Sequence, residues 1–420
     1  MRSSTGRLPA ALATAVALAA TAVAPAAAAP SPSPLPDTGQ SSAIGQASAT
    51  GRDVTVLPPL PVRLGDGRPC TAPSERTATG TTWTAPVLGL ARAQRLARGA
   101  GVTVAVVDSG VAPDIAGLSG RVTGADGDCL GHGSFTASLI AAAPRTDSGV
   151  TGVAPGAEVL ALRGTDARGV YSAGPVAAGI REAADRGADV IYTGAALTDG
   201  RAELADAVTY ATGKGALVVA PAAPDALPGQ DSGADDAGGA GDTPPSGGPY
   251  WPAAAPEALS VVDFGPSGTR PDGAPAAHRP DLAAPGDSVV GSGPGGKGHY
   301  IAFGSSLAAA CAAGAAALVR ERHPGLGPGQ VRARLLRTAY PAGVPRLDPY
   351  AALSLDTGTG PAARSAAAPP ARIPAPADTG SRNTALAVSG VCLAVIVLFG
   401  AAAAVLPRGR TRHWTPPGVG

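Results

Sequence analysis

The chain has 420 residues, with 32 Lys and Arg against 31 Asp and Glu, so its formal net charge is only +1. This length accommodates one large domain or two average ones. The balanced charge gives no electrostatic basis for a nucleic-acid partner, which we therefore exclude. Aromatic residues make up only 3% of the chain, so we expect a core of closely packed small aliphatic side chains.

Residues 1–29 have the layout of a secretory signal peptide. Two arginines precede an apolar stretch from Leu8 to Val23, and Ala26-x-Ala28 forms a cleavage motif. An uncleaved N-terminal anchor is the alternative. A Pro-rich leader and N-terminal extension, residues 30–82, should follow.

The other end of the chain predicts a membrane span. Residues 385–406 carry no charge, and a helix of this length reaches about 33 Å, enough to cross a bilayer core. Arginines follow at once, and positive flanks stay on the cytoplasmic side. We expect a linker over 356–383, a single-pass transmembrane helix over 384–407 and a cytoplasmic tail over 408–420. A buried helix of a soluble domain is the alternative.

Between these ends, residues 83–355 alternate short apolar runs with helical patterns. The expected strands are Val102–Val107, Val159–Leu162, Asp189–Tyr192, Ala216–Ala220 and Leu259–Val262. The expected helices are Ser134–Ala142, Gly174–Arg186, Ala202–Lys214, Ser306–Glu321 and Pro328–Thr338. Alternation of this kind predicts an α/β domain in which helices cover both faces of a parallel sheet.

A Gly/Asp/Pro-rich segment, residues 224–249, interrupts this pattern. Its five carboxylates raise the question of calcium, but their spacing matches no known binding loop. We therefore expect a solvated insertion, and no metal or cofactor.

Three polar residues are candidates for catalysis. Asp108 ends the first expected strand, where a carboxylate either orients an imidazole or caps the following turn. His132 lies between two glycines before a small-residue helix, and the alternative is a surface-loop histidine. Ser306 begins an Ala-rich helix, whose N-terminus favours an oxyanion; a role as helix cap is compatible with that.

The order of these residues is more specific than any one of them. Asp, then His, then Ser is the order of subtilisin-type enzymes, and it differs from that of the chymotrypsin-like and α/β-hydrolase folds. The sequence around Ser306 contains no Gly-x-Ser-x-Gly elbow, which argues against an unrelated esterase or lipase.

From Trp83 to Leu353 the chain resembles the subtilisin-like serine proteases, in particular the mycosins of type VII secretion. The segments that carry the resemblance are Gly101–Gly110, Gly131–Gly133, Gly152–Gly156, Tyr250–Ala253, Asp281–Gly286 and Gly304–Ala309. It implies a three-layer subtilisin-like fold with a central parallel sheet, plus one C-terminal transmembrane helix. It also implies an endopeptidase held outside the cell membrane, with protein substrates and a possible place in a type VII secretion membrane complex.

By this resemblance Ser306 attacks the scissile carbonyl, His132 relays the proton and Asp108 orients His132. The resemblance also supports a disulfide between Cys70 and Cys129, which is reasonable in loop-like sequence of an exported domain. A third cysteine, Cys311, sits among alanines and is expected to be a small buried residue.

The sequence departs from the family where an asparagine amide usually stabilises the oxyanion. The aligned position is Pro224, which offers no donor, and the only asparagine in the chain is Asn383. Asp225 follows and could donate only if protonated; membership of the solvated insertion is the interpretation that the sequence favours. The Ser306 amide would then be the remaining donor, and activity would be low.

A second departure lies at Asp189–Ala196, where relatives have an Asn-x-Ser-Leu-Gly-like strand that lines the substrate pocket. Tyr192, Thr193 and Gly194 imply an altered pocket, so specificity cannot be carried over. The alternative to an active peptidase is a catalytically impaired structural component of a type VII secretion complex.

Overall fold

The structure is a computed structural model, and it describes residues 56–124, 127–225, 248–356 and 380–411. The expected signal peptide, most of the leader, most of the acidic insertion, nearly all of the linker and most of the tail lie outside the described residues.

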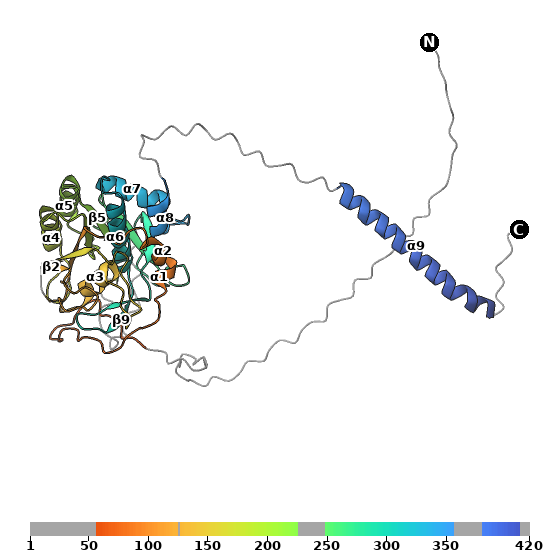
Figure 1. Ribbon diagram of the computed structural model, residues 1–420, viewed down its shortest axis with the longest axis horizontal. Helices are drawn as coiled ribbons and strands as arrows, with labels where there is room; N and C mark the ends of the chain where they lie inside the picture. Colours follow the sequence, from red (N-terminus) through yellow and green to blue (C-terminus); the bar gives the residue numbers. More distant parts are fainter. Residues whose placement is uncertain (1–55, 125–126, 226–247, 357–379, 412–420) are drawn as a thin grey trace, which may run out of the picture. The chain divides into compact units, whose positions relative to one another are not determined.

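A seven-stranded parallel sheet forms the centre of the domain, in the order β2-β3-β1-β4-β5-β6-β7 (Figure 1). Its strands are β1 (Thr103–Asp108), β2 (Val122–Gly124), β3 (Glu158–Arg163), β4 (Val190–Thr193), β5 (Leu217–Pro221), β6 (Leu259–Phe264) and β7 (Leu282–Pro285). Val104 of β1 pairs with Val159 of β3 on one side and with Val190 of β4 on the other. All five expected strands are present within one or two residues of their predicted ends.

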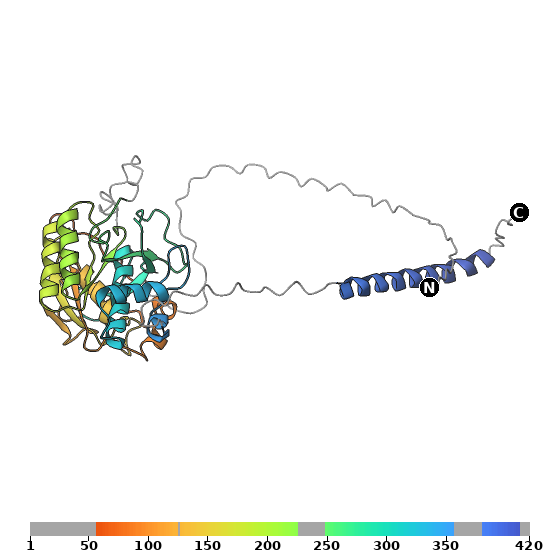
Figure 2. The same ribbon diagram turned by 90° about the horizontal axis from the view of Figure 1, so that it is seen from above.

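Helices cover both faces, as the alternation predicted. On one face lie α3 (His132–Ala141) and α6 (Ser305–Arg322), and on the other α4 (Ala173–Asp185) and α5 (Arg201–Gly213), which run side by side (Figure 2). Successive residues of β1 point to opposite faces, so Val104 and Val106 pack with α3 and α6, while Ala105 and Val107 pack with α4 and α5.

The other elements of the domain are shorter or lie around this core. They are α1 (Thr84–Val87), α2 (Leu90–Ala93), α7 (Pro328–Thr338), α8 (Pro349–Ser354) and an antiparallel hairpin of β8 (Val289–Ser292) and β9 (His299–Ala302). The sequence did not predict β2, β7 or the hairpin, whose strands are three or four residues long and are not continuous runs of large apolar side chains.

Small side chains allow α6 to lie close against its neighbours. The helix is buried from Ser305 to Val319, and a Cβ added at Gly314 would lie 2.6 Å from Cβ of Val153. Cys311 is buried within α6, as predicted. The expected core of small aliphatic residues is therefore confirmed, and it places the N-terminus of α6 firmly at one end of the sheet.

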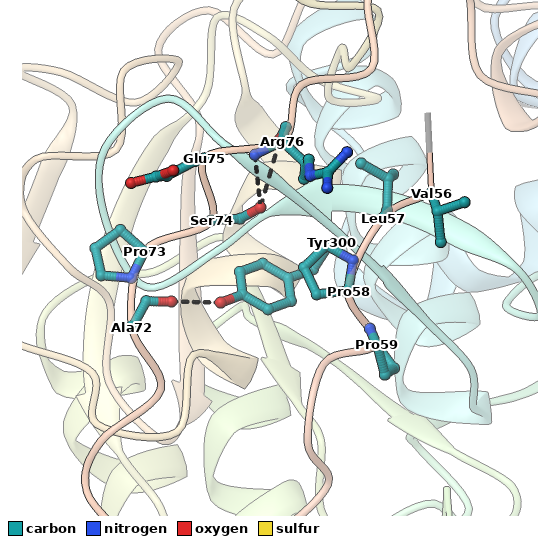
Figure 3. Close-up of a pocket in the computed structure, with 10 residues that line it drawn as sticks. All are labelled: Val56, Leu57, Pro58, Pro59, Ala72, Pro73, Ser74, Glu75, Arg76 and Tyr300. Carbon is teal, nitrogen blue, oxygen red and sulfur yellow. Dashed lines mark hydrogen bonds between the residues drawn. The ribbon is translucent and has the colours of Figure 1, made fainter. Parts of the chain in front are cut away.

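The N-terminal extension is bound to the domain along its described length. The amide of Leu60 donates to the carbonyl of Ile301 at 2.9 Å, and the amide of Thr71 donates to that of Cys129 at the same distance. Cys70 and Cys129 form the predicted disulfide. A cavity of about 510 Å³ lies between the extension and β9, where the hydroxyl of Tyr300 donates to the carbonyl of Ala72 (Figure 3).

We expect the disulfide to contribute substantially to stability. It joins residues 59 apart in the sequence, and closing a loop of that length in the unfolded chain is worth about 4 kcal/mol. The double substitution C70S/C129S should lower the free energy of unfolding by about that amount, measured by chemical denaturation. Reductant should reproduce the loss in the wild-type protein and have no further effect on the variant. Equal stability of the two proteins would contradict this prediction.

The last described element is α9 (Gly380–Thr411). Its stretch Thr384–Ala403 has a mean hydropathy of 2.5, which makes it long and apolar enough to cross a membrane.

Candidate active site

The three candidate residues converge at the carboxyl end of β1. Nδ1 of His132 lies 2.8 and 2.9 Å from the two carboxylate oxygens of Asp108, and Nε2 lies 3.0 Å from Oγ of Ser306. Asp108 and Ser306 are fully buried, and His132 is nearly so. The imidazole therefore connects a carboxylate to a hydroxyl at hydrogen-bonding distances, although His132 and Ser306 are 174 positions apart.

The start of α3 is fixed by a residue to which the sequence assigned no role. Oδ1 of Asp128 accepts the amide of Gly131 at 2.7 Å, and Oδ2 accepts that of Ser134 at 2.8 Å. Burial raises the pKa of Asp128, and these amide hydrogen bonds oppose that shift. Asp128 caps the otherwise unpaired N–H groups of the first turn and so sets the direction in which His132 enters the site.

Glycine brings the histidine helix against the aspartate strand. A Cβ on Gly133 would lie 2.0 Å from the carbonyl oxygen of Gly110 and 3.2 Å from Cβ of Asp108. The amide of Gly133 donates to Oγ of Ser109 at 2.9 Å. The glycine that follows His132 is thus required by the close approach of two backbones.

Asp225 lies against Ser306, which differs from the interpretation that the sequence favoured. Its Oδ1 accepts the amide of Ser306 at 2.9 Å, and its Oδ2 accepts Oγ–H of Ser306 at 2.5 Å. Oδ2 is also 3.3 Å from Nε2 of His132, and the Asp225 side chain is only 10% exposed. Of the two positions considered for the oxyanion region, the structure brings Asp225 to the Ser306 amide, and Pro224 lines the neighbouring cavity.

Gly304 makes this approach possible. Its φ of +146° is a backbone conformation that L side chains rarely adopt, and a Cβ there would lie 2.0 Å from Oδ1 of Asp225. The carboxyl group of Asp225 therefore occupies space that any side chain at position 304 would fill.

The two carboxylates affect the histidine in the same direction. Burial of the ring lowers the pKa of His132, but the negative charge and hydrogen bond of Asp108, followed by those of Asp225, outweigh it and raise this pKa well above its usual value. Both carboxylates therefore stabilise a positive charge on the His132 ring.

A second polar cluster supports Ser305, the residue before Ser306. Oγ of Ser305 donates to Oδ1 of Asp263 at 2.6 Å, and Arg270 donates to the same oxygen from Nε at 3.1 Å and from Nη2 at 3.0 Å. Together with Asp225 these residues line a cavity of about 310 Å³ beside Gly304. This cluster anchors the turn that carries Ser306, and no pattern in the sequence predicts it.

Tyr192 also contacts the site, which explains part of the altered strand at 189–196. Its hydroxyl is buried and donates to Oδ2 of Asp108 at 3.3 Å. A Cβ at Gly194 would lie 2.8 Å from the same oxygen and 2.2 Å from the hydroxyl of Tyr171. The two tyrosine hydroxyls thus lie near Oδ2 of Asp108, one of the two oxygens that contact Nδ1 of His132.

We expect Y192F to lower kcat/KM about tenfold, because Asp108 loses a hydrogen bond to an ionised group, worth about 1.5 kcal/mol or more. The matched control is Y210F, which removes an exposed hydroxyl that donates to Asp185 at 2.5 Å. It should leave kcat/KM unchanged. Equal activity of Y192F and wild type, measured on one peptide, would show that Tyr192 does not help to hold Asp108.

The described residues contain no group of three or more His, Cys, Asp or Glu side chains that could hold a metal ion.

Comparison with known proteins identifies the family. Residues 99–367 match the sequence pattern of the subtilase family of peptidases. The chain belongs to the subtilase family. It is a subtilisin-like serine peptidase, and the arrangement of Asp108, His132 and Ser306 is that of an Asp-His-Ser triad.

Individual relatives place it more narrowly. Mycosin-1 of Mycobacterium tuberculosis is 32% identical over 354 residues, which cover 70% of this chain and 78% of the relative. Thermitase of Thermoactinomyces vulgaris is also 32% identical, over 58% of this chain and 83% of the relative. This subtilase is thus of the mycosin type.

Solved structures support the same placement. The crystal structure of MycP1 from Mycobacterium smegmatis matches with a TM-score of 0.60 and 27% identity, over 73% of this chain and 94% of that structure. MycP3 protease from the type VII (ESX-3) secretion system matches with a TM-score of 0.55 and 29% identity, over 72% and 98%. The predicted subtilisin-like fold is confirmed.

Proposed function

We propose that this subtilase is a serine endopeptidase anchored in the cell membrane, with its peptidase domain outside the cytoplasm. Asp108, His132 and Ser306 are its catalytic triad. The observation that carries the proposal is the position of the His132 ring, 2.8 Å from Asp108 and 3.0 Å from Ser306.

The proposed chemistry follows from these contacts. Ser306 Oγ attacks the carbonyl carbon of a peptide bond while its proton passes to Nε2 of His132, and Asp108 stabilises the imidazolium through Nδ1–H. The proton then moves to the leaving amine as the C–N bond breaks. Water attacks the acyl-enzyme with His132 as base again, which releases the acid and restores Ser306.

The oxyanion region limits the expected rate. The Ser306 amide is one donor, and Oδ1 of Asp225 accepts it at 2.9 Å. By the resemblance to mycosins an asparagine amide would supply the second donor, but the single asparagine of the chain is Asn383. Loss of one oxyanion donor costs about 10²–10³ in kcat. We therefore expect a slow enzyme, suited to a few protein substrates rather than to general digestion.

The termini support the location. A signal peptide over 1–29 would export the chain. The proposed span 384–407, which lies within α9, would retain it, with the basic tail 408–420 in the cytoplasm. The peptidase domain at 83–355 would then stand on the linker 356–383, and a type VII secretion membrane complex is the partner that the mycosin relatives suggest. The full chain should resist alkaline carbonate extraction, whereas a chain ending at Asp356 should be released into the medium.

One observation favours a second candidate function. A carboxylate that accepts both hydrogen bonds of Ser306 blocks the nucleophile while it is ionised. The alternative is therefore a structural component of a secretion complex that retains the fold and has lost the reaction.

Peptide hydrolysis separates the two candidates. We expect the full chain in detergent to cleave internal bonds of quenched fluorescent peptides slowly, and S306A to cleave none. If wild type and S306A are equally inactive from acid to alkaline conditions, and both are folded by circular dichroism, the structural function is favoured.

A further inference from the structure

We propose that Asp225 is a further catalytic residue, which in its protonated form donates the second hydrogen bond to the oxyanion. This inference rests on the proposed function, since it assumes that Ser306 is the nucleophile. The proposed reaction requires that His132 and Asp225 together carry one proton.

The position of the carboxyl group is the first argument. Its Oδ1 lies 2.9 Å from the Ser306 amide, which is about the distance at which an oxyanion would sit from that donor. A substrate carbonyl that binds the amide must therefore displace Oδ1 and come to lie beside the carboxyl group. Gly304 leaves space for this group, whereas a Cβ at position 304 would lie 2.2 Å from its Cγ.

When Asp225 is ionised, the site has no base for the reaction. An ionised Asp225 accepts both the amide and Oγ–H of Ser306, so the hydroxyl proton points away from His132. Nε2 of His132, 3.3 Å from Oδ2 of Asp225, then carries a proton of its own, in keeping with the raised pKa of His132. No base is available in this state, and the carboxylate repels a developing oxyanion.

A shift of one proton makes the same site productive. If the proton on Nε2 of His132 passes to Asp225, the imidazole becomes neutral and accepts Oγ–H of Ser306, while Asp225 gains an O–H donor. The number of protons in the pair does not change. With no proton on the pair the carboxylate repels the oxyanion, and with two protons His132 cannot act as base.

In the productive state, Ser306 attacks the substrate carbonyl and His132 takes its proton. A bond forms between Ser306 Oγ and the carbonyl carbon, the Oγ proton moves to Nε2 of His132, and the carbonyl π electrons move to oxygen. The oxyanion accepts N–H of Ser306 and O–H of Asp225, which keeps its proton throughout. Collapse re-forms the carbonyl as the C–N bond breaks, and His132 gives its proton to the leaving amine.

Several charged or titratable groups face Asp225. His132 approaches from α3, with Asp108 behind it. Half-buried Tyr171, in the segment before α4, and buried Tyr192, in β4, also interact with Asp225. Asp263, Arg270 and Asp272 line the cavity on its other side, where Arg270 pairs with Asp263.

The test is the pH dependence of kcat/KM for the full chain in detergent, compared among wild type, D225N and D225A. Wild type should give a bell-shaped profile that falls at alkaline pH, when the shared proton is lost. D225N keeps a donor at every pH, so its profile should rise to a plateau as His132 loses its proton. At alkaline pH D225N should exceed wild type by about 10²–10³.

Two further variants, D225A and D272N, test whether the effect on the pH profile is specific to Asp225. D225A, with neither donor nor charge, should lack the alkaline fall and be slower than wild type at the wild-type optimum. D272N neutralises another carboxylate of the same cavity and should keep the wild-type profile. A wild-type profile that coincides with that of D225N, or a D225A variant as fast as wild type at its optimum, overturns the role of Asp225.

Labelling with a fluorophosphonate separates this inference from the proposed function. If neither wild type nor D225N hydrolyses peptide or is labelled at any pH, the proposed function itself fails. If both are labelled at Ser306 and have the same pH profile, only the role of Asp225 is lost.

Discussion

Replacing Asp108 with asparagine is expected to lower kcat about 10⁴-fold while the protein stays folded. The carboxylate accepts the Nδ1 proton of His132 at 2.8 Å, which leaves Nε2 free to take the proton of Ser306. An amide in this position can instead donate to Nδ1 and so favours the tautomer with its proton on Nε2, which cannot act as base. The measurement is kcat on a single fluorogenic peptide at the wild-type optimum.

D185N is the matched control for this experiment. Asp185 accepts hydrogen bonds from Tyr210 and contacts Lys214 on the exposed surface, so its replacement removes a carboxylate without reaching the site. D185N should keep the wild-type kcat. The pKa of His132 should also fall in D108N, because the charge of Asp108 is the main influence that raises it against burial. A loss of kcat below tenfold in folded D108N would exclude Asp108 from the triad.

Replacing Gly133 with alanine is expected to destabilise the fold by about 3 kcal/mol or more. The added Cβ would lie 2.0 Å from the carbonyl oxygen of Gly110, so either β1 or α3 has to move. His132 precedes this residue, and a displacement of about 1 Å can cost 10²-fold in rate. Chemical denaturation and kcat should therefore show parallel losses.

Gly213 provides the control, because it lies in α5 with nothing within 4 Å of an added Cβ. Alanine is the better helix former, so G213A should raise the free energy of unfolding by up to about 1 kcal/mol. It should leave kcat unchanged. If G133A were as stable and as active as wild type, the close approach of α3 to β1 would be wrong.

The sequence predicts the layers of this fold well, and the physical reason is burial. Strands covered on both faces read as continuous apolar runs, and α4 buries residues at a helical period. The strands β2, β7, β8 and β9 are short and lack such a run, because Gly, Pro, Ser or His interrupts their apolar residues.

The site also contains residues that the sequence predicts and residues that it does not. Asp108, His132 and Ser306 follow from their chain order and from the strand end, glycines and helix start that surround them. Asp225 does not, because its place depends on the backbone of Gly304, which lies 79 positions away and adopts a φ of +146°. The role of Asp128 could have been predicted from the sequence, since an aspartate shortly before a helix start is a capping signal.

Peptide mapping after reaction with a fluorophosphonate tests the central claim most directly, because the reagent marks a serine activated by a nearby base. The account predicts one adduct, on the peptide that contains Ser306, and its loss in H132A. An adduct on Ser305 or Ser109 instead, or undiminished labelling of Ser306 in H132A, would contradict it.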